Sequence, residues 1–165
     1  MNTYLLKKKI YNISLSKSNS ELNFFASKRS FLDRNLSTLK DVLIEISSIG
    51  KNEYGLSSND LYQSLKHVDN NQIIVLDNGI MLINNLYEKI KKNCIIFLRL
   101  KNPIQYNENK SLDIIFTFIV PRNINTSSKL QILSKLSRIL NKSNIRKKIR
   151  GADKAEDVLA LLIPS

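Results

Sequence analysis

The chain has 165 residues, of which 42% are hydrophobic and 24% are charged, and its formal net charge is +12 at pH 7. A chain of this length and apolar content is expected to fold as one globular domain that buries roughly two-thirds of its unfolded surface. No uninterrupted apolar run approaches the ~20 residues that a membrane-spanning helix needs, so no such helix is expected.

The chemistry that the composition leaves out is equally informative. A single cysteine, Cys94, excludes an internal disulfide and a cysteine-rich metal site, and its place in an apolar run predicts a buried, inert thiol. Lys7, Lys8 and Lys9 are not followed by an apolar segment, so no secretory signal is expected. We therefore predict a cytoplasmic protein without a cofactor or a metal.

The positive charge by itself would suit a nucleic acid or another polyanion. However, the chain is crowded with Lys, Asn and Ile, whose codons are rich in A and T. The base composition of the gene explains the basic balance better than a polyanion-binding role does.

The amino-terminal part of the chain is predicted to lead into one domain. Residues 1–20 are rich in Ser, Asn and Lys and show no sustained apolar period, which predicts a partly ordered lead-in before a domain over residues 21–165. Residues 21–26 are predicted to form a short strand. From residue 29 to residue 49 apolar side chains recur at steps of three and four, which predicts an amphipathic helix that Gly50 ends as its C-cap.

The next segments predict a short helix followed by a hairpin. Ser58-Asn59-Asp60 is a capping sequence for a helix that ends near His67. Two β-branched runs then surround Asp77-Asn78-Gly79, a strong turn signal, because Asn and Gly tolerate the positive φ of a tight reversal. The second run ends in Asn84-Asn85, and the end of a strand is a common place for a ligand site in α/β folds.

The carboxy-terminal half adds two strands and two helices. A helix is expected from Ser127 to Leu140, a basic turn from Asn144 to Arg150, and a last helix from Gly151 to residue 163. The fold class is therefore α/β, with a single mixed sheet of about four to five strands flanked by helices. The predicted strands are residues 21–26, 72–76, 79–83, 93–100 and 112–120.

The hairpin also carries a family resemblance. Residues 77–85, DNGIMLINN, resemble the active-site segment of the enzyme IIA proteins of the bacterial phosphotransferase system, mannitol/fructose class, most of all their nitrogen-related regulatory branch. That family reads roughly Gly-Asn-Gly-apolar-Ala-Ile-Pro-His-Gly, and its His accepts a phosphoryl group. Asn78 and Gly79 match, whereas Ile83 stands for the Pro and Asn84 for the acceptor His. The resemblance covers residues 21–163 by the order and spacing of elements, and it implies the fold of that family.

The resemblance implies a site whose chemistry has been removed. The position of the active-site Arg falls on Val68, which cannot bind two phosphate oxygens as a guanidinium does. The position of a second His, near the start of the helix after the last strand, falls on Lys129. Acceptor, supporting His and Arg are thus all replaced, which argues against phosphoryl transfer.

Two further features remain candidates for function. His67, the single histidine, is the one candidate substitute acceptor, although a His near a helix end is most often half solvated and favourable to the helix dipole. The basic cluster is a candidate docking patch for an acidic partner or RNA, although a solvated helix face is the better explanation. The cluster comprises Arg146, Lys147, Lys148 and Arg150. No glycine-rich phosphate loop or pair of catalytic carboxylates occurs in the sequence.

The leading hypothesis is an enzyme IIA-like regulatory protein that carries no phosphoryl group and binds partner proteins. The resemblance implies the partner class, a phosphocarrier protein or a regulated transporter or kinase. The alternatives are an active phosphocarrier that uses His67, a basic RNA- or polyanion-binding module, and a decayed remnant without a role.

Overall fold

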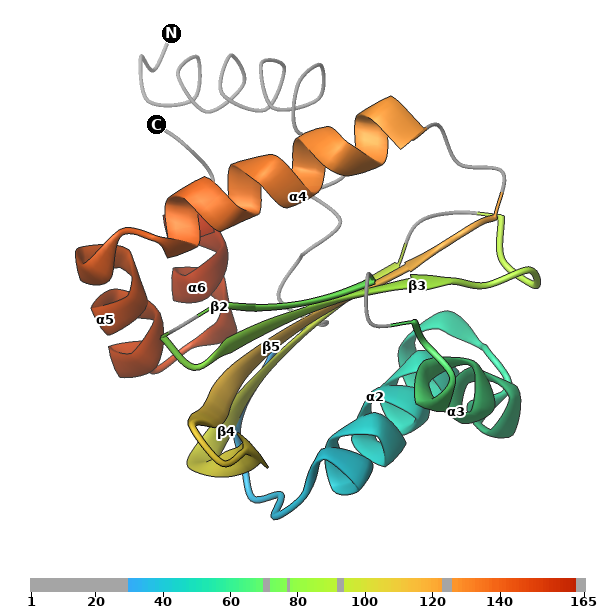
Figure 1. Cartoon of the computed structure of the whole chain (residues 1–165), viewed down its shortest axis with the longest axis horizontal. Helices are drawn as coiled ribbons and strands as arrows, with labels where there is room; N and C mark the ends of the chain where they lie inside the picture. Colours follow the sequence, from blue (N-terminus) through green and yellow to red (C-terminus); the bar gives the residue numbers. More distant parts are fainter. Residues whose placement is uncertain (1–29, 70–71, 77, 92–93, 123–125, 163–165) are drawn as a thin grey trace, which may run out of the picture.

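The computed structural model describes residues 30–69, 72–76, 78–91, 94–122 and 126–162 (Figure 1). Within these residues five strands form one sheet in the order β1-β4-β5-β3-β2. The strands are β1 (Ser30–Arg34), β2 (Ile73–Leu76), β3 (Ile80–Leu86), β4 (Cys94–Asn107) and β5 (Lys110–Val120), and the helices are α2 (Leu39–Tyr54), α3 (Ser58–Lys66), α4 (Thr126–Leu140), α5 (Ser143–Gly151) and α6 (Ala155–Leu162).

The sheet is mixed because hairpins and crossovers alternate along the chain. β2 and β3 form one antiparallel hairpin and β4 and β5 another, whereas β1 runs parallel to β4 and β3 runs parallel to β5. This confirms the predicted α/β class with its mixed sheet. None of the described helices is long and apolar enough to cross a membrane.

Helices cover both faces of the sheet, and each face has its own apolar core. On one face, buried side chains of α2 and α3 such as Ile46 and Leu61 pack on Met81 and Ile83 of β3. On the other face, α4, α5 and α6 pack on Ile80 and Leu82 of the same strand (Figure 1). Because successive side chains of a strand alternate between faces, strands buried on both sides read as continuous apolar runs, as β3 does.

The amino-terminal elements differ from the prediction. The expected strand at residues 21–26 and the lead-in lie outside the described residues, and β1 falls inside the predicted helix of residues 29–49. Phe31 and Leu32 fit a helical spacing, but this segment pairs with β4 instead. The helix begins only after Thr38, whose hydroxyl accepts from the Asp41 N–H at 3.1 Å while the Asp41 carboxylate accepts from the Thr38 N–H at 3.1 Å. This reciprocal capping box fixes the start of α2 at Leu39.

The predicted C-cap at Gly50 is also wrong. α2 continues to Tyr54, and Gly55, at φ 68°, is the left-handed residue that ends it. Gly50 instead lies at the crossing of α2 and α3, where an added Cβ would come within 2.5 Å of Leu61 Cδ2. The glycine thus permits a close helix contact rather than a helix end.

Two later segments are more regular than expected. The residues between the predicted strands 93–100 and 112–120 extend β4 and β5 into a long hairpin that turns at Glu108 and Asn109. The predicted basic turn of residues 144–150 is helical and forms α5. Both of its arginines are bonded to neighbouring segments.

Candidate functional site

The end of β3 presents its two asparagines to opposite faces of the sheet. The side chain of Asn84 follows Ile80 and Leu82 on the α4 face, and that of Asn85 follows Met81 and Ile83 on the α3 face. The Ser64 hydroxyl of α3 donates to Asn85 Oδ1 at 3.0 Å, which confirms the second assignment.

Asn84 lies in a closed and incompletely satisfied environment. Its side chain is buried, with a relative exposure of 7%, and Oδ1 finds no hydrogen-bond partner among the described residues. β3 and β5 are parallel, and their pairing continues to Leu86 and Val120. Both strands therefore end on the side of the molecule where α4 begins (Figure 1). Lys129 lies in the first turn of α4. The fold therefore brings these two predicted positions to the same end and the same face of the sheet.

The other two predicted positions belong to the opposite face. Val68 follows α3, is half-buried, and packs against the core between α3 and the sheet. His67 is exposed at the C-cap of α3, and its Nδ1 lies 2.8 Å from the carbonyl oxygen of Gln63. Since α3 covers the face away from the Asn84 side chain, the structure does not bring His67 and Asn84 together.

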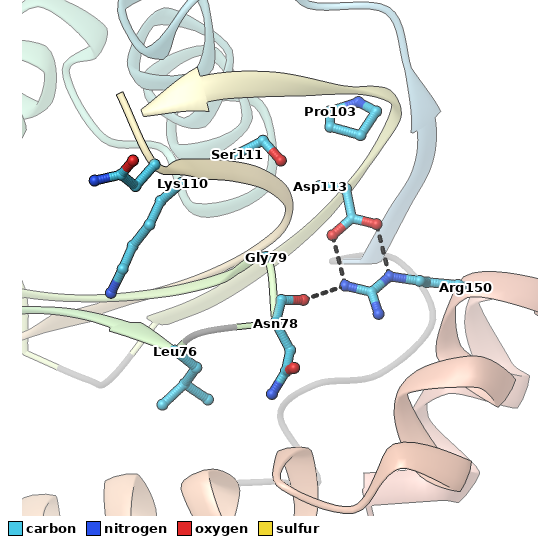
Figure 2. Close-up of a pocket in the computed structure, with 9 residues that line it drawn as sticks. Leu76, Asn78, Gly79, Pro103, Lys110, Ser111, Asp113 and Arg150 are labelled. Carbon is cyan, nitrogen blue, oxygen red and sulfur yellow. Dashed lines mark hydrogen bonds and ion pairs between the residues drawn. The ribbon is translucent and has the colours of Figure 1, made fainter. Parts of the chain in front are cut away.

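The Asn78-Gly79 turn lies at the far end of β3 from Asn84. Asn84 lies five positions after Gly79 along an extended strand, which corresponds to roughly 16 Å. The turn instead borders a pocket of about 280 Å³ (Figure 2). The pocket is lined by Leu76, Asn78, Gly79, Pro103, Asn109, Lys110, Ser111, Asp113 and Arg150.

An arginine of α5 fixes this turn to the sheet. Arg150 Nε donates to Asp113 Oδ2 at 2.7 Å and Nη2 donates to Asp113 Oδ1 at 2.9 Å, while Nη2 also donates to the carbonyl oxygen of Asn78 (Figure 2). The hydrogen bonds with Asp113 raise the already high pKa of Arg150. A two-pronged guanidinium–carboxylate pair is a strong and directional contact, so it defines the position of α5 against the turn.

The predicted docking patch on α5 divides into two kinds of residue. Arg150 is engaged with Asp113, and Arg146 Nη1 donates to the Leu140 carbonyl oxygen at 2.7 Å. Lys147 and Lys148 are exposed. The two arginines therefore hold the helix in place, although Arg150 is exposed as the two lysines are.

One buried side chain with a structural role was not predicted from the sequence. Arg99 of β4 has a relative exposure of 7%, and its Nη1 donates to the carbonyl oxygens of Ile149 at 2.9 Å and Ala152 at 2.6 Å. Its Nη2 donates to Asp33 Oδ1 at 2.9 Å. A cation at the carboxyl end of α5 satisfies carbonyl groups that the helix leaves unpaired and favours the helix dipole. The available signal was a lone arginine within the apolar run of residues 94–100.

The described residues hold no group of three or more potential metal-ligating side chains. A second, shallower pocket of about 400 Å³ lies between α2 and α3 and is lined by Ile44, Ser47, Ser48, Lys51, Asn52, Ser58, Asn59 and Tyr62.

Comparison with known proteins gives a consistent result. Residues 23–164 match the family model described as "Phosphoenolpyruvate-dependent sugar phosphotransferase system, EIIA 2". No curated protein gives a significant match.

Several solved structures share the fold. Nitrogen regulatory protein IIA-Ntr from Neisseria meningitidis is 23% identical, with a TM-score of 0.80 over 88% of this chain and 100% of that chain. IIA mannitol from Escherichia coli is 13% identical, with a TM-score of 0.69 over 84% of this chain and 98% of that chain. The complex of enzyme IIA mannitol with phosphorylated enzyme IIB mannitol from Escherichia coli matches at 12% identity, with a TM-score of 0.66 over 83% and 95% of the two chains.

Proposed function

We propose that this chain has a regulatory, protein-binding function without phosphoryl transfer. The chain belongs to the EIIA 2 family of the phosphoenolpyruvate-dependent sugar phosphotransferase system. The observation that carries the proposal is Asn84, which lies near the end of β3 and, by the resemblance to the family motif, takes the place of its acceptor histidine. The nitrogen-related regulatory branch is favoured by the likeness to IIA-Ntr from Neisseria meningitidis.

The chemistry of Asn84 is unsuited to a phosphoryl relay. A relay needs a nitrogen that is nucleophilic near pH 7 and that becomes a good leaving group afterwards, and imidazole meets both needs. The amide nitrogen of Asn84 has its lone pair delocalised into the carbonyl group. The burial of this side chain further limits the approach of a phosphorylated partner.

The neighbouring positions support the same proposal. Val68 offers no hydrogen-bond donor for phosphate oxygens, and it packs in the core on the far face. Lys129 would replace the imidazole of the second histidine of the family with an aliphatic amine. A carrier that uses His67 would need this side chain beside the docking surface around Asn84, whereas α3 covers the other face of the sheet.

A protein partner is the binding function that the family context favours. Enzyme IIA mannitol of Escherichia coli forms a complex with phosphorylated enzyme IIB mannitol. By analogy, we propose that this chain contacts a phosphocarrier protein or a regulated transporter or kinase in the cytoplasm. Because Asn84 never gains the negative charge of a phosphate, the docking surface would stay in one charge state at all times.

The test is a phosphorylation assay read by intact mass. The protein is incubated with phosphoenolpyruvate and the upstream phosphotransferase proteins at neutral to alkaline pH, beside the variants Asn84→His and His67→Ala. We expect no phosphate on the natural protein. Phosphate on the natural protein would refute the proposal, and its loss in His67→Ala would identify a rewired carrier.

The binding half of the proposal is tested separately by calorimetric titration of the natural protein with the unphosphorylated phosphocarrier protein. We expect saturable binding that is retained in Asn84→His. If neither protein bound any of the phosphotransferase proteins, the regulatory role within this system would be refuted.

A further inference from the structure

We infer that Asn78 is a site of spontaneous covalent modification, at which the side-chain amide is converted to a carboxylate, and that Arg150 controls the rate. Asn78 is exposed at the tip of the β2–β3 hairpin and is followed by Gly79. Among the asparagines of the whole sequence, no other precedes a glycine.

The reaction is an internal attack by the backbone. The Gly79 nitrogen loses its proton and forms a bond with Asn78 Cγ. The Cγ–Nδ2 bond breaks, and the NH2 group takes up a proton and leaves as ammonia, so that a five-membered succinimide ring remains. Water then opens the ring at either carbonyl carbon and gives aspartate or isoaspartate. Glycine favours the first step because it has no Cβ to obstruct the approach of its nitrogen. Because of this loss of ammonia, asparagine is among the thermolabile residues.

The fold restrains both peptide groups that must move for ring closure. The Gly79 carbonyl oxygen accepts from the N–H groups of Asp113 at 3.0 Å and Ile114 at 3.2 Å. The Asn78 carbonyl oxygen accepts from Arg150 Nη2, and Asp113 holds this guanidinium by two further hydrogen bonds. To bring the Gly79 nitrogen onto Cγ, the Asn78–Gly79 peptide must rotate away from these donors. Breaking the contact with Arg150 is therefore a part of the barrier.

The product would change the pocket beside the turn. Asn78 lines this pocket together with Lys110, Asp113 and Arg150 (Figure 2). A new carboxylate there would compete with Asp113 for the guanidinium of Arg150. In the isoaspartate product the backbone gains one methylene group, which displaces the carbonyl oxygen that Arg150 holds. The modification thus alters the charge of the pocket and the anchor of α5 together.

The experiment follows deamidation by peptide mapping and mass spectrometry during incubation at mildly alkaline pH. In the natural protein we expect Asn78 to react before any other described asparagine. In Arg150→Met we expect the rate at Asn78 to rise roughly tenfold, because a hydrogen bond from a charged donor no longer has to be broken. Lys147→Met, an exposed position on the same helix, is the matched control and should leave the rate unchanged.

Two further measurements separate a loosened turn from an unfolded protein. The rate at Asn78 in concentrated guanidinium chloride gives the value for the unrestrained chain. Asp113→Asn keeps the arginine but weakens its orientation, so its rate should lie between those of the natural protein and Arg150→Met. Earlier reaction at another described asparagine, or equal rates in the natural protein and both variants, would overturn the inference.

Discussion

The buried Arg99 gives a strong quantitative prediction about stability. Replacing it by methionine keeps much of the side-chain volume. The substitution removes the hydrogen bonds to the carbonyl oxygens of Ile149, Arg150 and Ala152, and the contact with Asp33. Hydrogen bonds from a charged donor contribute about 1.5–3 kcal/mol each. The two short bonds to carbonyl groups would therefore give about 3–6 kcal/mol, from which the relieved cost of burying a charge must be subtracted.

We therefore expect the free energy of unfolding to fall by about 3 kcal/mol in Arg99→Met. For a protein of this size this corresponds to a decrease in Tm of about 6–12 °C. Urea unfolding followed by circular dichroism measures the first quantity, and a thermal scan measures the second.

Two control variants isolate the cause. Lys101→Met removes an exposed cation from the same strand and should change stability by less than about 0.5 kcal/mol. Asp33→Asn removes the carboxylate, whose side chain is 68% exposed, and should cost less than about 1 kcal/mol. A loss below about 1 kcal/mol in Arg99→Met, or an equal loss in Asp33→Asn, would refute the view that the helix carbonyl groups are the important partners.

Two other predictions concern backbone conformation and pH. In urea unfolding, Gly79→Ala should lower the free energy of unfolding more than Gly55→Ala does. Both glycines have positive φ, 83° and 68°, which costs an alanine about 1–2 kcal/mol at either position, but only at Gly79 would the new Cβ meet Asp113 Oδ1, at 2.9 Å. Equal losses would show that the contact with Asp113 is relieved at no cost. Burial, and to a smaller extent the charge of Asp60, raise the pKa of Tyr87. The contribution of the neutral Tyr87 side chain to stability is therefore complete below the ordinary tyrosine pKa of about 10, and it is lost as the pH rises through the raised pKa. Tyr87→Phe should remove part of this alkaline loss and should cost little at neutral pH, because the buried hydroxyl has no hydrogen-bond partner among the described residues; an unchanged pH profile in this variant would contradict the assignment.

The fold was predictable from local patterns wherever pairing is local. The β2–β3 hairpin followed from two β-branched runs around Asn78-Gly79, and the α/β class followed from the alternation of strands and helices. β1 was not predictable in this way, because a five-residue strand that pairs in parallel with the distant β4 leaves only two apolar residues as its signal. The same two residues fit the helical spacing of the segment that follows.

The candidate site was predictable in identity more than in arrangement. The motif placed Asn84 just after a strand of residues 79–83, whereas β3 continues through Asn84 to Leu86. The family motif also suggested that Asn78 and Gly79 belong to the same site, but they lie at the opposite end of β3 from Asn84. The contact between Arg150 and Asp113 joins residues 37 positions apart, and no local pattern predicts such a pair.

The position of Arg99 also bears on the order in which the chain can fold as it is synthesised. The five described strands and the helices α2 and α3 are complete once residue 120 has been made, so the α2–α3 face needs no later part of the described chain. Its carbonyl partners at Ile149 and Ala152 are made later. Until then a guanidinium in the middle of the sheet must stay hydrated, so the face that receives α4, α5 and α6 must remain open to water. The face covered by α2 and α3 can thus close earlier during synthesis than the face covered by α4, α5 and α6.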